Sequence, residues 1–329
     1  MPKTRVYLDI PLDPDAVLNL PAAPARHVTR VLRLRAGMAL VLFNGQGGEF
    51  DAEIIEIRGQ TVSVRIGRHR EPDRESPLTL RLVQGISRTE RMDWVIQKAV
   101  ELGVSRIEPV FTVRSVVQLN TERAARRLQH WRAIAIHACE QCGRNRIPEI
   151  TSPLPLTKWI ASRCERRGQP FLESPVLAGC EPGGNPLKDS LIREPAACGE
   201  KPYARENDDL PILRAANPSF DNRQQSAART KENNRRNPQR AAPPQLTNAS
   251  LPGSLLLLQP GAKKRFADIR HTEGPITLLV GPEGGLTPEE TECAMAIGFI
   301  PVSLGPRTLR TETAAIAGLT AIDLCWGDF

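Results

Sequence analysis

Short apolar segments that alternate with polar positions fill the first 70 residues of the chain. The segments RVYLDI, MALVLFNGQGGEFDAEIIEI and TVSVRI contain or are followed by turn signals at Asn44-Gly45, Gly47-Gly48 and Gly59. Such alternation is typical of half-buried strands, and Asn-Gly or Gly-Gly pairs are typical of tight turns between antiparallel strands. The pattern predicts a small antiparallel barrel or sandwich, followed by the polar linker EPDRESP.

From Leu78 onward, apolar strands alternate with amphipathic helices. LTLRLVQG and SRIEPVFT predict two strands, and RMDWVIQKAVELG between them predicts a helix. One face of this helix carries Met92, Val95, Ile96, Ala99 and Val100. A strand, a helix and a strand in this order imply a right-handed crossover and a parallel sheet.

A second helix is expected after Thr121, and apolar strands return near the end of the chain. The buried stripe of this helix is predicted to contain Leu128, Trp131, Ala135, Ala138 and Cys142. The later strands are SLLLLQPG, ITLLVG and IPVSLG. The chain therefore has the pattern of an α/β protein.

The region from about Leu172 to Pro252 has a different composition. It includes AANPSFDNRQQSAARTKENNRRNPQRAAPPQ, which is poor in large apolar residues. A segment of this kind cannot bury enough surface to offset the entropy lost on ordering. We predict a disordered insertion at about 172–252, within a second domain spanning 73–329 that follows a first domain at 1–72.

The net charge is +7, with 44 basic and 37 acidic side chains and a pI of about 9.2. This balance favours a polyanionic partner without identifying one. The start, MPKTRVYLDIPLD, has charges where a signal peptide needs an apolar core, and no segment approaches the length of a membrane span. We therefore expect a cytoplasmic protein with no membrane partner.

Seven cysteines are scattered along the chain, and we expect mostly free thiols. Cys139 and Cys142 form a C-x-x-C pair, which could indicate zinc binding or redox chemistry. A structural zinc site needs four ligands, and no second pair stands at a suitable spacing. The sequence therefore predicts no metal site.

Two glycine-bearing loops, each between an apolar strand and a helix, are the strongest candidates for a binding site. They are VGPEGG, from Val280, and LGPRTLRTETA, from Leu304. Gly-Pro-x-Gly-Gly alone is more often a simple turn. However, ligands of parallel α/β sheets bind where the loops at the carboxyl ends of strands converge, so two such loops predict one shared pocket. Neither loop matches a dinucleotide or phosphate-loop motif, and Glu283 favours a cationic or neutral ligand over a pyrophosphate.

These two segments, in this order, resemble the C-terminal motifs of the SPOUT methyltransferases. More closely, the chain resembles the family of bacterial small-subunit rRNA uridine N3-methyltransferases. The resemblance extends to RMDWVIQKAVELGVSRIEPV, RSVVQL, HACEQCGRNRIPEI and HVTRVLRLRAGMALVLFNGQG, and so covers nearly everything except the insertion. It implies a PUA-like N-terminal β-barrel and a SPOUT domain with a parallel sheet and a C-terminal trefoil knot. It also implies a homodimer that uses S-adenosyl-L-methionine to methylate N3 of a specific uridine in 16S rRNA.

The resemblance also implies which residues form the cofactor site. They are Leu258, Gln259, Gly281, Glu283, Gly284, Gly285, Leu304, Gly305, Leu309, Arg310, Glu312, Thr313 and Ala314. Methylation at N3 requires an unpaired or flipped base and the loss of the N3 proton. We expect the Arg310 guanidinium to stabilise the negative charge that then spreads to O2 and O4, which makes Arg310 the candidate catalytic residue.

Candidate RNA contacts lie outside the two loops. Arg26, Arg30 and Arg33 form a basic ridge on a short helical piece, for which a solvated face is the alternative. Arg114 and Arg144 are further candidates. Two other functions remain open from the sequence: a SPOUT enzyme with another RNA target, such as tRNA or a ribose hydroxyl, and a non-catalytic PUA-type RNA-binding protein. RNA binding without binding of the methyl donor would favour the latter.

Overall fold

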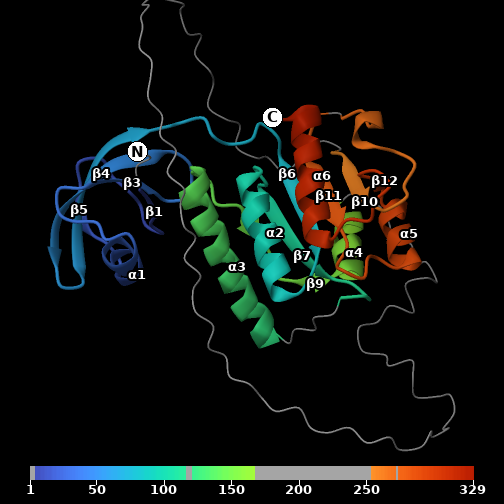
Figure 1. The fold of residues 1–329 in the computed structure, drawn as a ribbon, viewed down its shortest axis with the longest axis horizontal. Coiled ribbons are helices and arrows are strands. Elements are labelled where there is room, and N and C mark those ends of the chain that lie inside the picture. The colour runs from blue at the N-terminus through green and yellow to red at the C-terminus, as the bar shows by residue number, and fades with distance from the viewer. Residues whose placement is uncertain (1–3, 116–120, 167–252, 272) are drawn as a thin grey trace, which may run out of the picture. The chain divides into compact units, whose positions relative to one another are not determined.

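The computed structural model describes residues 4–115, 121–166, 253–271 and 273–329 (Figure 1). The predicted insertion at about 172–252 lies outside these residues. Among the described helices, none combines the length and the apolar character needed to cross a membrane.

The N-terminal residues form a five-stranded sheet with the strand order β1-β3-β4-β5-β2. The strands are β1 (Arg5–Tyr7), β2 (Val17–Asn19), β3 (Ala39–Phe43), β4 (Glu49–Arg58) and β5 (Thr61–Arg70). β3, β4, β5 and β2 pair antiparallel, whereas β1 joins β3 in parallel. One apolar cluster, which includes Leu40, Leu42 and Ile54, fills the interior of this part. The short helix α1 (Ala22–Arg26) continues into a π-helical turn, η1 (His27–Val31). The predicted short helical piece that carries Arg26 and Arg30 is therefore present.

A parallel sheet of seven strands forms the second part. The strands are β6 (Leu80–Gly85), β7 (Arg106–Phe111), β8 (Glu149–Ile150), β9 (Leu154–Pro155), β10 (Leu255–Leu258), β11 (Ile276–Val280) and β12 (Ile300–Val302). Their order is β12-β10-β11-β6-β7-β8, and β9 also pairs with β7. Neighbouring strands of this sheet all run parallel to one another. β11 is buried along its whole length, as is typical of a β-branched and aliphatic strand in the middle of a parallel sheet.

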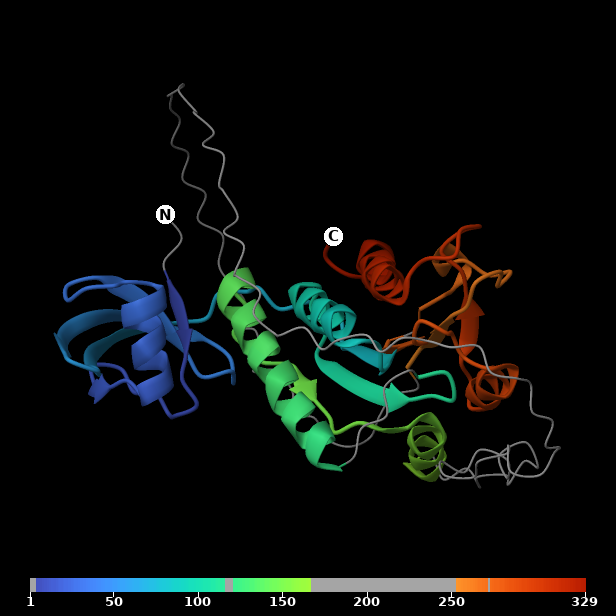
Figure 2. The ribbon, with the colours of Figure 1, turned by 60° about the horizontal axis from the view of Figure 1, so that its bottom comes forward.

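Helices cover both faces of the larger sheet (Figure 2). They are α2 (Thr89–Glu101), α3 (Thr121–Cys142), α4 (Leu156–Arg166), the 3-10 turn η2 (Phe266–Asp268), α5 (Pro288–Ala296) and α6 (Thr311–Trp326). The apolar cluster on one face includes α2, α3 and α6, and the cluster on the other includes α4 and α5. Alternate residues of β6, β10 and β11 enter different clusters, for example Leu278 and Leu279 of β11.

The predicted helix faces are confirmed for α2 and are partly wrong for α3. All five predicted residues of α2 are buried. On α3, Trp131, Ala135 and Ala138 are buried, but the stripe continues through Cys139, while Leu128 and Cys142 are half-buried. Burial raises the pKa of the Cys139 thiol to about 12, so this cysteine is an unreactive core residue.

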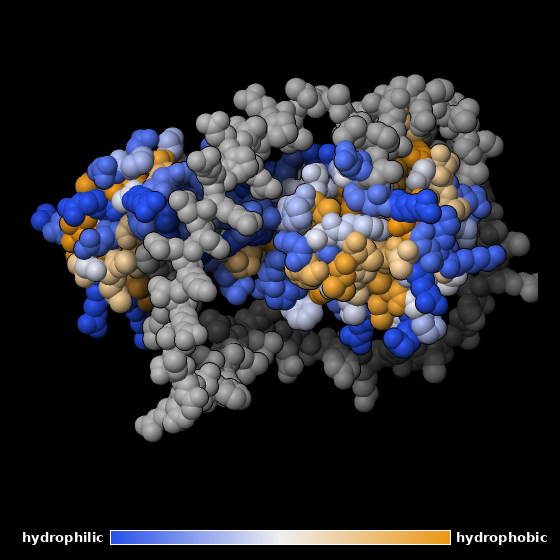
Figure 3. All heavy atoms as spheres, turned by 90° about the horizontal axis from the view of Figure 1, so that it is seen from above, coloured by the Kyte–Doolittle hydropathy of each residue, from blue (hydrophilic) through white to orange (hydrophobic). Residues whose placement is uncertain are grey.

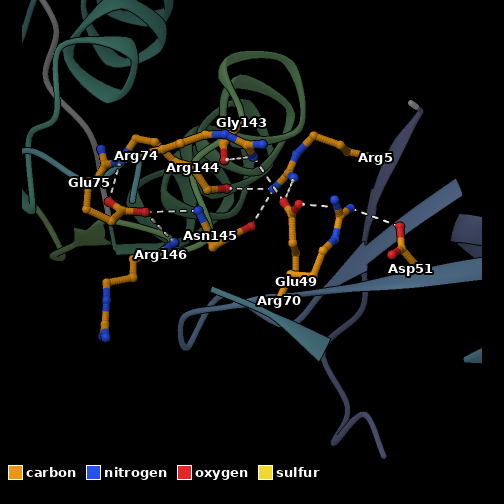
Figure 4. A network of polar contacts seen from close by, with 10 residues as sticks. All are labelled: Arg5, Glu49, Asp51, Arg70, Arg74, Glu75, Gly143, Arg144, Asn145 and Arg146. Atoms are coloured by element: carbon orange, nitrogen blue, oxygen red, sulfur yellow. Dashed lines mark hydrogen bonds and ion pairs between the residues drawn. The ribbon is translucent and has the colours of Figure 1, made fainter. Parts of the chain in front are cut away.

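A polar network joins the N-terminal sheet to the loop that follows α3 (Figure 4). The Glu49 carboxylate, almost fully buried, accepts from Arg5 and forms ion pairs with Arg70 (3.2 Å) and Arg74 (3.0 Å). Arg5 also donates to Asn145 Oδ1 at 2.5 Å, and Arg74 donates to the Gly143 carbonyl at 3.2 Å. Glu49 is therefore the shared acceptor for three arginines.

Arg144 lies inside this junction. Its guanidinium donates to Glu75 Oε2 at 2.8 Å and to the carbonyls of Val100 and Val104, both at 2.9 Å. Its side chain is only 6% exposed. The structure places Arg144 in the interior, where its Nε and Nη1 are used to fix the loop after α3, and its predicted RNA contact stays a prediction.

Asp323 on α6 is a buried acidic residue in the core. It is 2% exposed, and neither carboxylate oxygen has a hydrogen-bond partner among the described residues. Burial, and then the nearby charge of Asp328, raise its pKa from 3.8 to about 6. The folded state therefore holds this proton more tightly than the unfolded chain, and it loses stability as the pH rises from about 4 to about 6.

We expect Asp323→Asn to stabilise the protein by about 2–3 kcal/mol at neutral pH, because it removes an uncompensated buried charge. Thermal unfolding across the acid range would measure this effect. The gain should vanish near pH 4, where wild-type Asp323 is neutral. Asp13→Asn, at an exposed position far from Asp323 in the chain, serves as the control. Equal stability of Asp323→Asn and wild type at neutral pH would contradict the prediction.

Candidate active site

The loop between β11 and α5 ends at a capping box, which a threonine followed three residues later by a glutamate favours. Thr287 caps α5: its hydroxyl accepts from Glu290 N at 3.2 Å, and Glu290 Oε2 accepts from Thr287 N at 2.9 Å. Gly285 has a φ of +69° and donates its N–H to the Pro282 carbonyl at 2.9 Å, which closes the turn. A glycine is suited to this left-handed conformation because it has no Cβ to clash.

A cavity of about 600 Å³ opens at the carboxyl ends of β10, β11 and β12. Its walls are formed by 257–260, the β11–α5 loop (280–286) and the β12–α6 loop (304, 305 and 307–311), with Arg91, Arg114, Thr291, Val302 and Ala314. The predicted cofactor residues line this cavity, except Glu312 and Thr313. The two glycine-bearing loops thus share one pocket, and the end of β10 forms its third wall. The volume falls in the range of small-molecule sites.

Two glutamates, Glu283 and Glu312, lie at one side of the cavity with Arg91 between them. Glu283 Oε1 accepts from Arg88 N at 3.0 Å and from Arg91 Nη1 at 3.2 Å, and Arg91 Nε lies 3.8 Å from Glu312 Oε1. Burial raises the pKa of Glu283, but the hydrogen bond from Arg88 N and the charge of Arg91 outweigh it, so the pKa lies below its usual value. Glu283 is therefore ionised at neutral pH. Its Oε2 is buried without a partner among the described residues, which favours a cationic or donor group in the ligand.

A buried amide ties the loops together at the base of the pocket. Thr311 Oγ1 donates to the Gly281 carbonyl at 2.6 Å, and Gln84 Nε2 donates to Thr311 Oγ1 at 3.0 Å. Gly85 allows this close approach, because a Cβ there would lie 2.5 Å from Pro282 N. Sequence analysis did not identify Gln84 or Arg91. The signal for Gln84 was a polar residue followed by a glycine at the carboxyl end of a strand.

The predicted arginines separate into two groups. Arg310 lines the cavity and is exposed, while Arg114 donates from Nη1 to the carbonyls of Gly284 (3.1 Å) and Leu286 (3.4 Å) and so supports the β11–α5 loop. Arg26, Arg30 and Arg33 are exposed on and just after the helical segment of the N-terminal sheet and do not line the cavity. The structure thus brings Arg310 and Arg114 together with the cofactor residues.

Two family models account for most of the chain. The model of an RNA methyltransferase domain matches residues 74–193 and 244–323, and that of an RNA methyltransferase PUA domain matches residues 20–67. The chain belongs to the RNA methyltransferase family. The predicted family is thereby confirmed, and so is the coarser fold prediction of an α/β domain with a parallel sheet next to a PUA-like domain.

Relatives and solved structures similar to this RNA methyltransferase agree with the assignment. Ribosomal RNA small subunit methyltransferase E of Buchnera aphidicola (Schizaphis graminum) is 28% identical over 324 residues, which cover 98% of this chain and 97% of the relative. A methyltransferase of Legionella pneumophila, solved with its bound cofactor SAM, is 30% identical, with a TM-score of 0.71 and full coverage of both chains. A Ribosomal RNA small subunit methyltransferase E from Neisseria gonorrhoeae, bound to S-adenosyl methionine, is 29% identical with a TM-score of 0.68, and 99% of each chain is covered.

Proposed function

We propose that this RNA methyltransferase transfers a methyl group from S-adenosyl-L-methionine to N3 of one uridine in the 16S rRNA of the small ribosomal subunit. The observation that carries the proposal is the cavity formed by the two glycine-bearing loops and the end of β10. It occurs in a chain that resembles, along almost its whole length, a small-subunit rRNA methyltransferase solved with S-adenosyl methionine.

The pocket residues fit this cofactor. Gly281, Gly284 and Gly285 expose backbone groups along one wall, and Leu258 and Leu304 supply apolar surface. The buried, unpartnered oxygen of Glu283 suits a positively charged or hydrogen-donating ligand. When bound, S-adenosyl-L-methionine supplies an electrophilic methyl group on a sulfonium centre.

The reaction sets two requirements for the RNA base, and two arginines of the pocket help to meet them. The base must leave its stack to reach the cavity, and N3 must lose its proton before it can attack. Arg310 is the last residue before α6 and lines the cavity. Its guanidinium can stabilise the negative charge on the uridine oxygens. Arg114 holds the opposite loop in place, so that the base meets a preformed surface.

We further propose that the C-terminal segment forms a trefoil knot and that the domains divide at 1–72 and 73–329. The parallel order β12-β10-β11-β6, with β10 between two strands that follow it in sequence, supports a threaded arrangement. The hydrogen bond between Thr311 and Gly281 holds the two knot loops together in this proposal.

We also propose that the enzyme is a homodimer. α6 is apolar on nearly all sides, and a helix of this character is normally covered. α2 packs against α6, and each helix leaves one large apolar side chain exposed, Trp94 (55%) and Leu324 (64%). Figure 3 shows apolar residues gathered on one face over the larger sheet and its helices. A second copy of the chain would cover such a surface.

The proposed substrate places the protein in the cytoplasm, where bacterial small subunits are assembled. Methyl transfer from a sulfonium requires no metal ion, and we propose none. Among the described residues, no group of three or more His, Cys, Asp or Glu side chains could hold one.

The test is methyl transfer from labelled S-adenosyl-L-methionine to small subunits and to naked 16S rRNA from a strain that lacks this protein. We expect N3-methyluridine at one site, identified by mass spectrometry. A methyl group found on tRNA or on a ribose hydroxyl would favour another RNA target. Folded protein that binds RNA but transfers no methyl group to any of these substrates would favour the non-catalytic alternative.

A further inference from the structure

Four exposed basic residues lie in or just after segments that form walls of the cavity, and one of them, Arg307, lines the cavity itself. They are Lys263, Lys264, Arg265 and Arg307, which we call the basic rim. None of them takes part in an ion pair with another described residue. Asp268 Oδ2 accepts from the backbone N–H of Arg265 at 2.8 Å, in the cap of η2. The side-chain charges of the basic rim are therefore available to an anion.

Backbone hydrogen bonds join the segment that contains Lys263, Lys264 and Arg265 to the end of β12, which precedes Arg307 in the chain. Ser303 N donates to the Lys264 carbonyl at 2.9 Å, and Gln259 N donates to the Val302 carbonyl at 3.0 Å. Lys264 also forms a parallel bridge with Val302. Gln259 and Leu304 both line the cavity, so the basic rim begins within a few residues of two of its walls.

Other arginines near the cavity differ from the basic rim because they have partners within the protein. Arg91 forms an ion pair with Glu283, and Arg114 donates to two loop carbonyls. These contacts stabilise the pocket itself. A group of like charges without counter-charges repels itself and contributes nothing of this kind to the fold, but it produces a positive potential that attracts a polyanion.

We propose that the basic rim binds phosphates of the RNA strand that flank the target nucleotide, while the flipped base enters the cavity. This inference rests on the proposed function, because it assumes an RNA substrate at this pocket. Phosphate contacts of lysine and arginine position a nucleic acid without reading its sequence. An extended strand with its base removed from the stack offers phosphates on both sides of that base, so a charged surface beside the cavity is well placed to hold it.

The test compares two double variants of the full-length protein. Lys263→Gln/Lys264→Gln removes two charges from the basic rim, whereas Arg132→Gln/Lys158→Gln removes two exposed charges from α3 and α4, away from the cavity residues. Affinity for a 16S rRNA transcript is measured between about 50 and 200 mM salt. We expect the rim variant to bind about tenfold more weakly at the low-salt end, and its salt slope to fall by about one for each phosphate that it no longer binds.

Affinity for S-adenosyl-L-methionine should be the same in both variants and in the wild type. Equal RNA affinity and equal salt slope in the rim variant and wild type would overturn the inference, even in an active enzyme. An equal weakening in both double variants would also overturn it, because the effect would then follow net charge alone. If the wild type methylates no RNA but only the rim variant binds RNA more weakly, the proposed reaction fails while the basic rim stands as an RNA contact.

Discussion

Arg310→Ala should lower kcat for methyl transfer by about 100- to 1,000-fold, the effect typical of removing one group that stabilises a developing oxyanion. Arg310 lines the cavity, is exposed, and forms no ion pair with another described residue. Its charge is therefore free to act on the substrate. The deprotonated uridine carries negative charge on O2 and O4, and a guanidinium fixed beside it would stabilise that charge as it forms.

The fold should tolerate this substitution. Arg310 is the N-cap residue of α6, but its side chain makes no capping hydrogen bond. Its structural contribution comes from the backbone carbonyl, which accepts from Ala314 N at 2.7 Å. Its backbone is extended, with φ −64° and ψ 152°, a conformation that alanine adopts without strain. The unfolding temperature should therefore stay close to that of the wild type.

Single-turnover and steady-state kinetics separate the chemical step from binding. Arg310→Lys keeps the charge but loses the planar fork of donors, so we expect partial activity. Arg307→Ala is the matched comparison, since this neighbouring arginine should affect the KM for RNA more than kcat. An unchanged kcat in Arg310→Ala would remove Arg310 from the chemistry.

The parts of this protein that sequence could predict are those governed by local periodicity. The buried face of α2, the fully buried β11 and the capping box of Thr287 and Glu290 each depend on residues within one helix or strand. The position of the pocket was predictable as well, because loops at the carboxyl ends of neighbouring parallel strands must converge.

The contacts that sequence did not reveal join residues far apart in the chain. Arg91 looks like an ordinary polar position on α2, and only the fold brings it within 3.2 Å of Glu283 Oε1, 192 residues away. Arg144 looks like a surface cation in a basic segment, yet Glu75 and two carbonyls bind it in the interior. A charged residue shows no local sign of whether its partner is a ligand or another part of the same chain.

Glu49→Gln should destabilise the protein by about 3 kcal/mol at neutral pH, near the lower end of the range for breaking a buried ion pair. The Glu49 side chain is 2% exposed and that of Arg5 is 9% exposed, so the loss of the carboxylate leaves Arg5 buried without its counter-charge. Arg70 and Arg74 are about two-fifths exposed and can be solvated by water, which limits the cost. Because this network joins the N-terminal sheet to the loop after α3, the substitution should weaken both sides of the junction.

The pH dependence distinguishes this effect from a simple packing defect. Burial raises the pKa of Glu49, but the hydrogen bond and charge of Arg5, together with Arg74, outweigh it and hold the pKa below its usual value. A group with a lowered pKa in the folded state stabilises the protein fully above its unfolded pKa, about 4.3 for glutamate. This stabilisation is lost as the pH falls through the folded-state value. Wild type and Glu49→Gln should therefore differ most at neutral pH and converge in acid.

Denaturant unfolding at neutral pH and at about pH 3 measures both parts of the prediction. Glu53→Gln is the matched control, because Glu53 lies on the same strand at an exposed position. It should change the free energy of unfolding by no more than about 0.5 kcal/mol. Equal stability of the two variants at neutral pH would show that the three arginines do not need Glu49. A constant difference across the pH range would instead assign the loss to packing, because a carboxylate acts through its charge only while it is ionised.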